Sequence, residues 1–317
     1  MEKYVITPTP HIRDPITIER IMLLVLIALA PAAIMGVVMF GLRALLVILV
    51  TVGSAVGFEW LYQRITKQES TIKDYSAAVT GLLLAFNVPP TVPLWLPIVG
   101  SFVAIVVAKQ LFGGLGQNFI NPALAGRAFL MAAYMPHMAG GFVEPLTGFL
   151  DFDVIAMATP LAPDGEWDFI SMLIGRQGGT IGETSAILLI LGGLFLLYKK
   201  IISWHIPVAF IGTVAVLTFL LEPGWTFATP TFHVLAGGLL LGAFFMATDY
   251  SSSPVSPLGK LIMGFGCGLI TVLIRLYGGY PEGVSYAILL MNCCVPLIDK
   301  FTKPKIFGAK PKEKAQA

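Results

Sequence analysis

Residues 21–41 read IMLLVLIALAPAAIMGVVMFG, an apolar run that contains no charged side chain. Its length matches the hydrocarbon core of a bilayer, which a helix of about 20 residues crosses. The run is too long for the apolar core of a secretory signal, so we expect it to remain as a membrane helix. The proline and glycines inside it are tolerated there, because neighbouring helices satisfy the freed backbone groups.

The rest of the chain has the same character. Of its 317 residues, 56% are hydrophobic and only 12% are charged, whereas soluble domains carry about 25% charged residues. We therefore expect an all-α polytopic membrane protein with about ten transmembrane helices. The predicted spans are residues 21–41, 43–62, 75–88, 93–111, 119–136, 184–198, 203–221, 231–248, 258–277 and 283–298.

The positive charges predict the orientation of these spans. With a cytoplasmic N-terminus, all but four of the 20 lysines and arginines fall on the cytoplasmic side; Lys109, for example, is assigned to a cytoplasmic loop. Cytoplasmic loops are enriched in Lys and Arg. Both termini of a multi-pass protein of the cell (inner) membrane are therefore predicted to be cytoplasmic. The four exceptions are Arg43, Arg127, Arg176 and Arg275.

The predicted spans divide the chain into two halves. A cytoplasmic segment over 1–20 precedes a first repeat over 21–136. An extracytoplasmic loop over 137–183 then leads to a second repeat over 184–298, and a basic cytoplasmic tail over 299–317 ends the chain.

Short sequence matches in the same order link the two halves. Residues 81–86 read GLLLAF and residues 239–244 read LLLGAF, while 111–114 read LFGG and 276–279 read LYGG. Each half has five predicted spans, an odd number, so the two repeats would have inverted topologies. Inverted repeats with interrupted helices place binding sites between the halves, near the middle of the membrane.

Several charged residues within or beside the spans admit two interpretations. Arg127 marks a site, or it snorkels to the interface. Glu183 contacts a ligand, or it favours a helix N-terminus through the macrodipole. Asp249 contacts an ion or another bound ligand, or it is a plain interfacial acid. Arg275 and Glu282 flank the last external turn, and we expect them to pair with each other.

The cysteines and the missing motifs narrow the function. Cys267, Cys293 and Cys294 lie in apolar segments without metal-ligand spacing, so we expect buried thiols rather than disulfides. The sequence contains no nucleotide-binding loop, no dinucleotide fingerprint and no cysteine cluster. We therefore do not expect this chain to bind NAD, ferredoxin or an iron–sulfur cluster by itself, and we expect no nucleic-acid partner.

Thr159 lies in the long external loop, between Ala158 and a proline. A threonine hydroxyl is a poor nucleophile unless a neighbouring group activates it, and no histidine or lysine stands next to it in the sequence. Taken alone, the residues favour an ordinary solvated loop threonine.

Five segments together carry a resemblance that covers residues from about 5 to 303. They are similar to the NqrB/RnfD family, whose members belong to the Rnf complex, a ferredoxin:NAD oxidoreductase of bacterial and archaeal membranes, or to the sodium-pumping NADH:quinone reductase. The segments are NFINPALAGRAFL at 118–130, ATPL at 158–161, GETSA at 182–186, FFMATD at 244–249 and YPEGVSYA at 280–287.

The resemblance implies that a separate flavin transferase attaches FMN to Thr159 through a phosphoester bond, on the outer face of the membrane. The family pattern has an aspartate six residues before the threonine and an alanine one before, which Asp153 and Ala158 match. Ala156 departs from the usual hydroxyl residue three before. The resemblance also implies a possible second, non-covalent flavin, riboflavin. We expect the flavin-binding residues to include Asn118, Asn121, Arg127, Glu183 and Asp249.

The resulting hypothesis is a flavin-carrying electron-transfer subunit of an Rnf-type complex, which couples electron flow between ferredoxin and NAD to translocation of Na+ or H+. Its expected partners are the A, B, C, E and G subunits of Rnf, a flavin transferase and membrane lipid. An inverted-repeat solute transporter or channel without flavin fits the repeat equally well. A purely structural membrane anchor is a third possibility. A covalent flavin on Thr159 would distinguish the first hypothesis from the other two.

Overall fold

The computed structural model describes residues 16–140, 142, 159, 161, 168–183, 185–222, 228–278 and 282–303. Every regular element in these ranges is a helix, so the all-α prediction is confirmed for this part of the chain. Asp153 and Ala158 lie outside the described residues.

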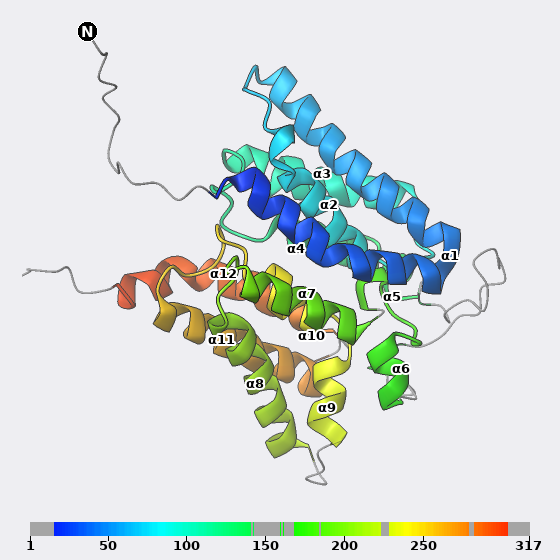
Figure 1. Ribbon diagram of the computed structural model, residues 1–317, viewed down its shortest axis with the longest axis vertical. Coiled ribbons are helices and arrows are strands. Elements are labelled where there is room, and N and C mark those ends of the chain that lie inside the picture. Colours follow the sequence, from blue (N-terminus) through cyan, green and yellow to red (C-terminus); the bar gives the residue numbers. More distant parts are fainter. Residues whose placement is uncertain are drawn as a thin grey trace, which may run out of the picture.

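The first helix, α1 (Ile18–Ile65), is bent into two arms. Thr17 caps its start by accepting a hydrogen bond from the backbone N–H of Arg20 at 3.3 Å. At Gly41 the backbone has φ 69° and ψ −159°, a conformation that residues with a side chain rarely adopt. The arms diverge from this bend in Figure 1, in dark and lighter blue. They correspond to the first two predicted spans.

The remaining elements of the first half are shorter. Helix α4 begins with Asn121, whose side chain accepts a hydrogen bond from the backbone N–H of Leu124, and with Pro122 at its first position, two signals that favour a helix start. The other elements are η1 (Ile72–Asp74), α2 (Ser76–Phe86), α3 (Trp95–Phe102), its π-helical continuation η2 (Val103–Val107), η3 (Gln110–Phe112), α4 (Pro122–Ala133) and α5 (Met135–Ala139).

The second half contains a broken span. Helices over Thr229–Leu235 and Leu239–Met246 meet at an angle of 63°, around a glycine, Gly237, with φ +65°. The elements after α5 are α6 (Phe169–Ile174), η4 (Ile181–Glu183), α7 (Ala186–Tyr198), α8 (His205–Leu221), α9 (Ala228–Leu235), α10 (Leu239–Leu241), the π-helix η5 (Gly242–Met246), α11 (Pro257–Tyr277) and α12 (Val284–Phe301).

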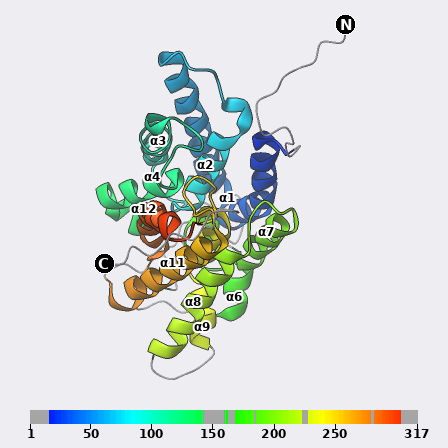
Figure 2. The same ribbon diagram turned by 90° about the vertical axis from the view of Figure 1, so that its left-hand side faces the viewer.

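Each half contains a helix that packs against two other helices of the same half. In the first half α3 contacts both α1 and α4, and in the second half α11 contacts both α8 and α12. The halves meet where α1 contacts α7 and where α4 contacts α12. Figures 1 and 2 show the first half, in blue to teal, beside the second half, in green to red. The start of α1 and the end of α12 lie on the left of Figure 1, opposite the bend of α1 and α6 on the right.

Length and composition identify fewer spans than the sequence predicted. Within the described residues, four helices are long and apolar enough to cross a membrane, or five if the broken pair is one span. The predicted spans 75–88, 119–136, 184–198 and 203–221 correspond to shorter apolar helices of 10–17 residues. Several apolar helices are what a polytopic membrane protein requires, but the count of ten stays a prediction.

The expectation of three buried thiols is only partly right. All three cysteines are free, and Cys267 is fully buried. Cys293 and Cys294 are exposed on α12, because they lie outside the stripe of buried residues that includes Asn292 and Val295.

Candidate functional site

Four charged residues and one asparagine lie together at the junction between the two halves. We call this group the charged cluster; its members are Arg127, Glu183, Arg275, Glu282 and Asn87. Arg127 is its centre and is 5% exposed. One of its guanidinium nitrogens donates to Asn87 Oδ1 at 2.6 Å, and another forms an ion pair with Glu282 Oε2. The pair joins α4 to a residue two positions before α12, so Arg127 does not snorkel to the interface.

Two members of the charged cluster hold the broken span. Arg275 of α11 donates to the backbone carbonyls of His233 at 2.5 Å and Ala236 at 2.9 Å. These carbonyls belong to the last turn of α9 and to the residue after it, a place where a cation is favourable. At the start of α10, the Cβ position of Gly238 is 3.8 Å from Glu183 Oε1. The break therefore has a cation at one helix end and a carboxylate at the other.

The predicted pairing of Arg275 with Glu282 is wrong. Glu282 pairs with Arg127 instead, and Arg275 is held by backbone carbonyls. The sequence placed Arg275 and Glu282 on one turn, but could not show that Arg127 reaches the same turn from α4.

Thr159 lies in a buried position although it belongs to a long loop. It is 4% exposed, and its hydroxyl oxygen has no hydrogen-bond partner among the described residues. Two residues later, Leu161 packs over the break: a Cβ built on Gly237 would lie 2.8 Å from Leu161 Cδ1, 3.3 Å from an Arg275 guanidinium nitrogen and 3.9 Å from Glu282 Cγ. The segment that contains Thr159 is therefore anchored beside the charged cluster, and a freely solvated threonine is excluded.

The charged cluster contains further unpartnered oxygens. Within the described residues, Glu183 Oε1 and Glu282 Oε1 are buried without a hydrogen-bond partner. Buried polar atoms in native proteins are nearly always partnered by protein, water or a ligand. Together with Thr159, these atoms indicate a place where polar partners from outside the chain are accommodated.

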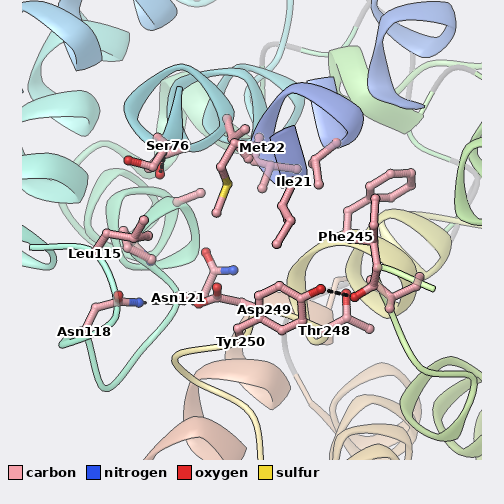
Figure 3. Close-up of a pocket in the computed structure, with 18 of the residues that line it drawn as sticks. Ile21, Met22, Ser76, Leu115, Asn118, Asn121, Phe245, Thr248, Asp249 and Tyr250 are labelled. Atoms are coloured by element: carbon pink, nitrogen blue, oxygen red, sulfur yellow. Dashed lines mark hydrogen bonds between the residues drawn. The ribbon is translucent and has the colours of Figure 1, made fainter. Parts of the chain in front are cut away.

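A cavity of ≈ 90 Å³ lies elsewhere between the halves. Figure 3 shows Ile21 and Met22 of α1 on one side and Asn118, Asn121 and Asp249 on the other. Much of its wall is apolar, including Val25, Val79, Leu83, Phe244 and Phe245. The volume is several times what one water needs, which is about 15 Å³, so the cavity has room for more than a single solvent molecule.

The polar residues of the cavity are held in place by hydrogen bonds. Asn118 donates to the backbone carbonyl of Ile120 at 3.0 Å and to Asp249 Oδ2 at 3.4 Å. The same carboxylate oxygen accepts from the hydroxyls of Ser251 and Ser252, each at 2.9 Å. These bonds hold the turn over residues 249–252 in place at one edge of the cavity.

The predicted flavin-binding residues therefore separate into two groups. Asn118, Asn121 and Asp249 line the cavity, whereas Arg127 and Glu183 belong to the charged cluster. Helix α4 connects the groups: Asn121 is its N-cap and Arg127 lies six residues further along, which is about 9 Å of helix axis.

The sequence interpretation missed a buried ion pair that includes one residue of the cavity wall. Lys109, expected in a cytoplasmic loop, is 1% exposed and lies 2.7 Å from Glu59 Oε2 of α1. Opposite charges in two apolar segments are costly unless they pair. One acid within the predicted span 43–62 and one lysine within 93–111 were therefore a signal that could have revealed this contact.

The polar groups of both regions have chemistry that suits a flavin. The hydroxyl of Thr159, buried and without a partner among the described residues, is of the type that can accept a phosphoester, and Arg275 lies close to Leu161, two residues further along the chain. The cavity combines aromatic and aliphatic walls with amide, hydroxyl and carboxylate groups, the usual composition of a cofactor site. No group of three or more His, Cys, Asp and Glu residues that could hold a metal ion occurs in the described ranges.

Several apolar helices, a broken span and two buried polar regions between the halves define a polytopic helical membrane protein. The chain belongs to the NQR2, RnfD, RnfE family, whose model matches residues 5–308.

Relatives are similar over nearly the whole chain. The D subunit of the Na(+)-translocating ferredoxin:NAD(+) oxidoreductase complex of Acetobacterium woodii is 49% identical, over 98% of both chains. The D subunit of the proton-translocating ferredoxin:NAD(+) oxidoreductase complex of Clostridium ljungdahlii is 45% identical over 97% of both. The D subunit of the ion-translocating oxidoreductase complex of Halorhodospira halophila is 36% identical over 94% of both.

Proposed function

We propose that this chain is the D-type membrane subunit of an ion-translocating ferredoxin:NAD oxidoreductase complex and that it carries electrons on flavin. The observation that carries the first part is the 49% identity, over 98% of both chains, to a relative named as such a subunit. Relatives named for Na+ and for protons are about equally similar, so the proposal covers translocation of either ion. The A, B, C, E and G subunits of Rnf supply the ferredoxin and NAD sites.

The covalent flavin in this proposal is FMN on Thr159. The hydroxyl oxygen of Thr159 attacks the phosphorus of a flavin mononucleotide phosphoanhydride on the transferase, its proton passes to a base of that enzyme, and the other half of the anhydride leaves. A separate transferase explains why Thr159 needs no neighbouring base of its own. When bound, the flavin supplies one- and two-electron chemistry.

The charged cluster has a role in this proposal that its contacts support. Leu161 and an Arg275 guanidinium nitrogen lie 2.8 Å and 3.3 Å from the same Cβ position of Gly237, so a phosphodiester on Thr159, two residues before Leu161, would add negative charge near a guanidinium that can stabilise it. The unpartnered oxygens of Glu183 and Glu282 are available to accept from flavin N–H groups or from water. The packing of Leu161 on Gly237 holds the chain two residues after Thr159 close to Arg275 and Glu282.

A second flavin, riboflavin, is proposed for the cavity. Asn118, Asn121 and Asp249 would hold its polar atoms, while Phe244 and Phe245 provide aromatic wall. Acid extraction of protein that carries Thr159→Val, followed by chromatography of the released flavin, tests this assignment. Riboflavin in about equimolar amount is expected, and its absence would remove the second flavin from the proposal.

The topology in this proposal has ten spans in two inverted repeats, with both termini in the cytoplasm of a cell membrane. It is supported by the distribution of lysine and arginine and by the position of the start of α1 and the end of α12 on one side of the molecule. Cysteine labelling of intact cells at Ile16 and Phe301 is expected to fail from outside, and labelling of only one of them would contradict an even number of spans.

The main experiment is in-gel fluorescence of protein made together with a flavin transferase, beside a Thr159→Val variant. A fluorescent band under ultraviolet light that the variant loses is the expected result. A dark band in both would contradict the covalent flavin and favour a transporter or channel, for which the broken span is suitable; transport assays in liposomes would then be the next step.

A further inference from the structure

Lys109 is an unusual side chain in the wall of the cavity, because its ammonium group is almost fully buried. Its Nζ donates to Glu59 Oε2 and to Ser76 Oγ, both at 2.7 Å. Ser76 in turn donates to Asp74 Oδ1 at 2.6 Å. A lysine that is 1% exposed needs such partners to remain charged.

The partners of Lys109 fix its position. Glu59, itself fully buried, uses its second oxygen to accept from the Thr71 hydroxyl at 2.8 Å and from the Gln63 amide at 3.5 Å. Gln63 also donates to the Thr71 hydroxyl at 2.7 Å. The ammonium is therefore held by a network that reaches across α1, η1 and α2 rather than by a single flexible contact.

One N–H of Lys109 remains for an occupant of the cavity. A lysine ammonium has three N–H groups, and only two of them have partners among the described residues. Of the charged residues, Lys109 and Asp249 line the cavity. Asp249 Oδ2 already accepts from two serines and Asn118, so Lys109 is the charged group that still has a hydrogen bond to give.

We propose that Lys109 is a positioning residue for the cavity. Its ammonium makes the cavity favour a ring system that becomes negatively charged on reduction, and the carboxylate of Glu59 limits this preference. The inference rests on the proposed second flavin. A neutral flavin ring bound there would gain one negative charge on taking up two electrons from the donor side of the complex and one proton from water. The third N–H of Lys109 would face that charge, and the carboxylate of Glu59 would offset part of the field of the ammonium.

The test uses riboflavin as the probe in a Thr159→Val background, so that no covalent flavin contributes to the signal. The measurement is the midpoint potential of the bound riboflavin, followed by absorbance, for Glu59→Gln, Lys109→Met and the double variant. Glu59→Gln leaves the ammonium uncompensated, so the preference for reduced over oxidised riboflavin should rise about tenfold or more. Lys109→Met should lower this preference by a similar factor, and the double variant should return close to the parent value.

The signs of these shifts distinguish charge from structure. Shifts of the same sign in both single variants, or none in either, would overturn the inference while leaving the second flavin intact. If Lys109→Met does not fold because Glu59 is left unpaired, the neutral double variant is compared with Glu59→Gln alone. Its preference for reduced riboflavin should be lower, which tests the sign of the Lys109 effect in the same way. Absence of riboflavin from the parent protein would remove the second flavin and overturn this inference with it.

Discussion

The charged cluster and the Lys109–Glu59 pair are both buried between apolar helices, but they differ in how fully their polar atoms are partnered. Both oxygens of Glu59 accept hydrogen bonds. In the charged cluster, Glu183 and Glu282 each keep one oxygen without a partner in the described structure.

The two regions also differ in what they connect. Glu59 and Lys109 both belong to the first half, whereas Arg127 and Glu282 join the first half to the second. A closed network beside a cavity holds one charge at a fixed point, while an open cluster at the junction retains atoms for a further group. The first arrangement is suited to tuning a bound ring, and the second to receiving one.

The largest expected effect comes from breaking the charged cluster. Arg127→Met leaves Glu282 as an unpaired buried charge and Asn87 without its donor, so we expect a loss of about 3–5 kcal/mol in unfolding free energy. Thermal stability of the detergent-solubilised protein, measured by size-exclusion chromatography after heating, checks this. Arg43→Met is the control, because Arg43 is exposed and makes a single bond to the Thr91 carbonyl at 2.8 Å, and it should cost about 1 kcal/mol or less.

For the Lys109–Glu59 pair, the effects of the two substitutions on unfolding free energy should instead be non-additive. Lys109→Met alone should destabilise the protein by about 3 kcal/mol, because the charge of Glu59 stays buried. Adding Glu59→Gln should recover much of that loss, as neighbours in one network do not behave independently. The same heating assay on the two single variants and the double variant checks this, and strictly additive losses would show that the two side chains do not interact.

A smaller effect is expected where Thr159 is anchored. Gly237→Ala places a methyl group 2.8 Å from Leu161 at φ +65°, so we expect a cost of about 1–3 kcal/mol and greater accessibility of residue 159. Labelling of a Thr159→Cys variant, with the three native cysteines replaced, measures that accessibility. Gly53→Ala is the matched control, since nothing lies within 4 Å of its Cβ position; equal labelling in both variants would argue against the anchor.

The smallest effect is expected in the short helix α6, which precedes Glu183 in the chain and lies outside the predicted spans. The backbone N–H of Ser171 and its hydroxyl both donate to Asp168 Oδ2 at 3.0 Å. These bonds, the backbone one first, hold the pKa of the Asp168 carboxyl below its usual value. The lowered pKa means that this stabilisation is present above the pKa of an unfolded aspartate and is lost as pH falls through the folded pKa. Hydrogen exchange of α6 should therefore accelerate on acidification, and Asp168→Asn should abolish that dependence.

Much of the fold could be predicted from the sequence because long apolar runs specify membrane helices directly. Residues 21–41 and 43–62 correspond to the two arms of α1, and 258–277 and 283–298 to α11 and α12. The interrupted segments were harder to delimit. Residues 119–136 divide at Tyr134, and 231–248 break at Gly237, because local backbone conformation ends a helix without interrupting its apolar composition.

The candidate site was only partly predictable. The resemblance supplied Thr159 and the polar residues of two motifs, but it could not show that Asn121 and Arg127 belong to different regions at opposite ends of one stretch of α4. Lys109 was expected in a loop because its position in the sequence fitted the rule for positive charges; it does lie in the turn between η2 and η3, but its side chain is buried. Long-range pairs such as Arg127–Glu282 join residues far apart in the chain, and no local pattern specifies them.

Peptide mass spectrometry of protein made with an active flavin transferase tests the central claim most directly. The peptide containing Thr159 is expected to gain the mass of FMN less one water, with fragment ions that place the addition on Thr159. Finding that peptide unmodified, in protein from cells whose transferase modifies another substrate, would contradict the account.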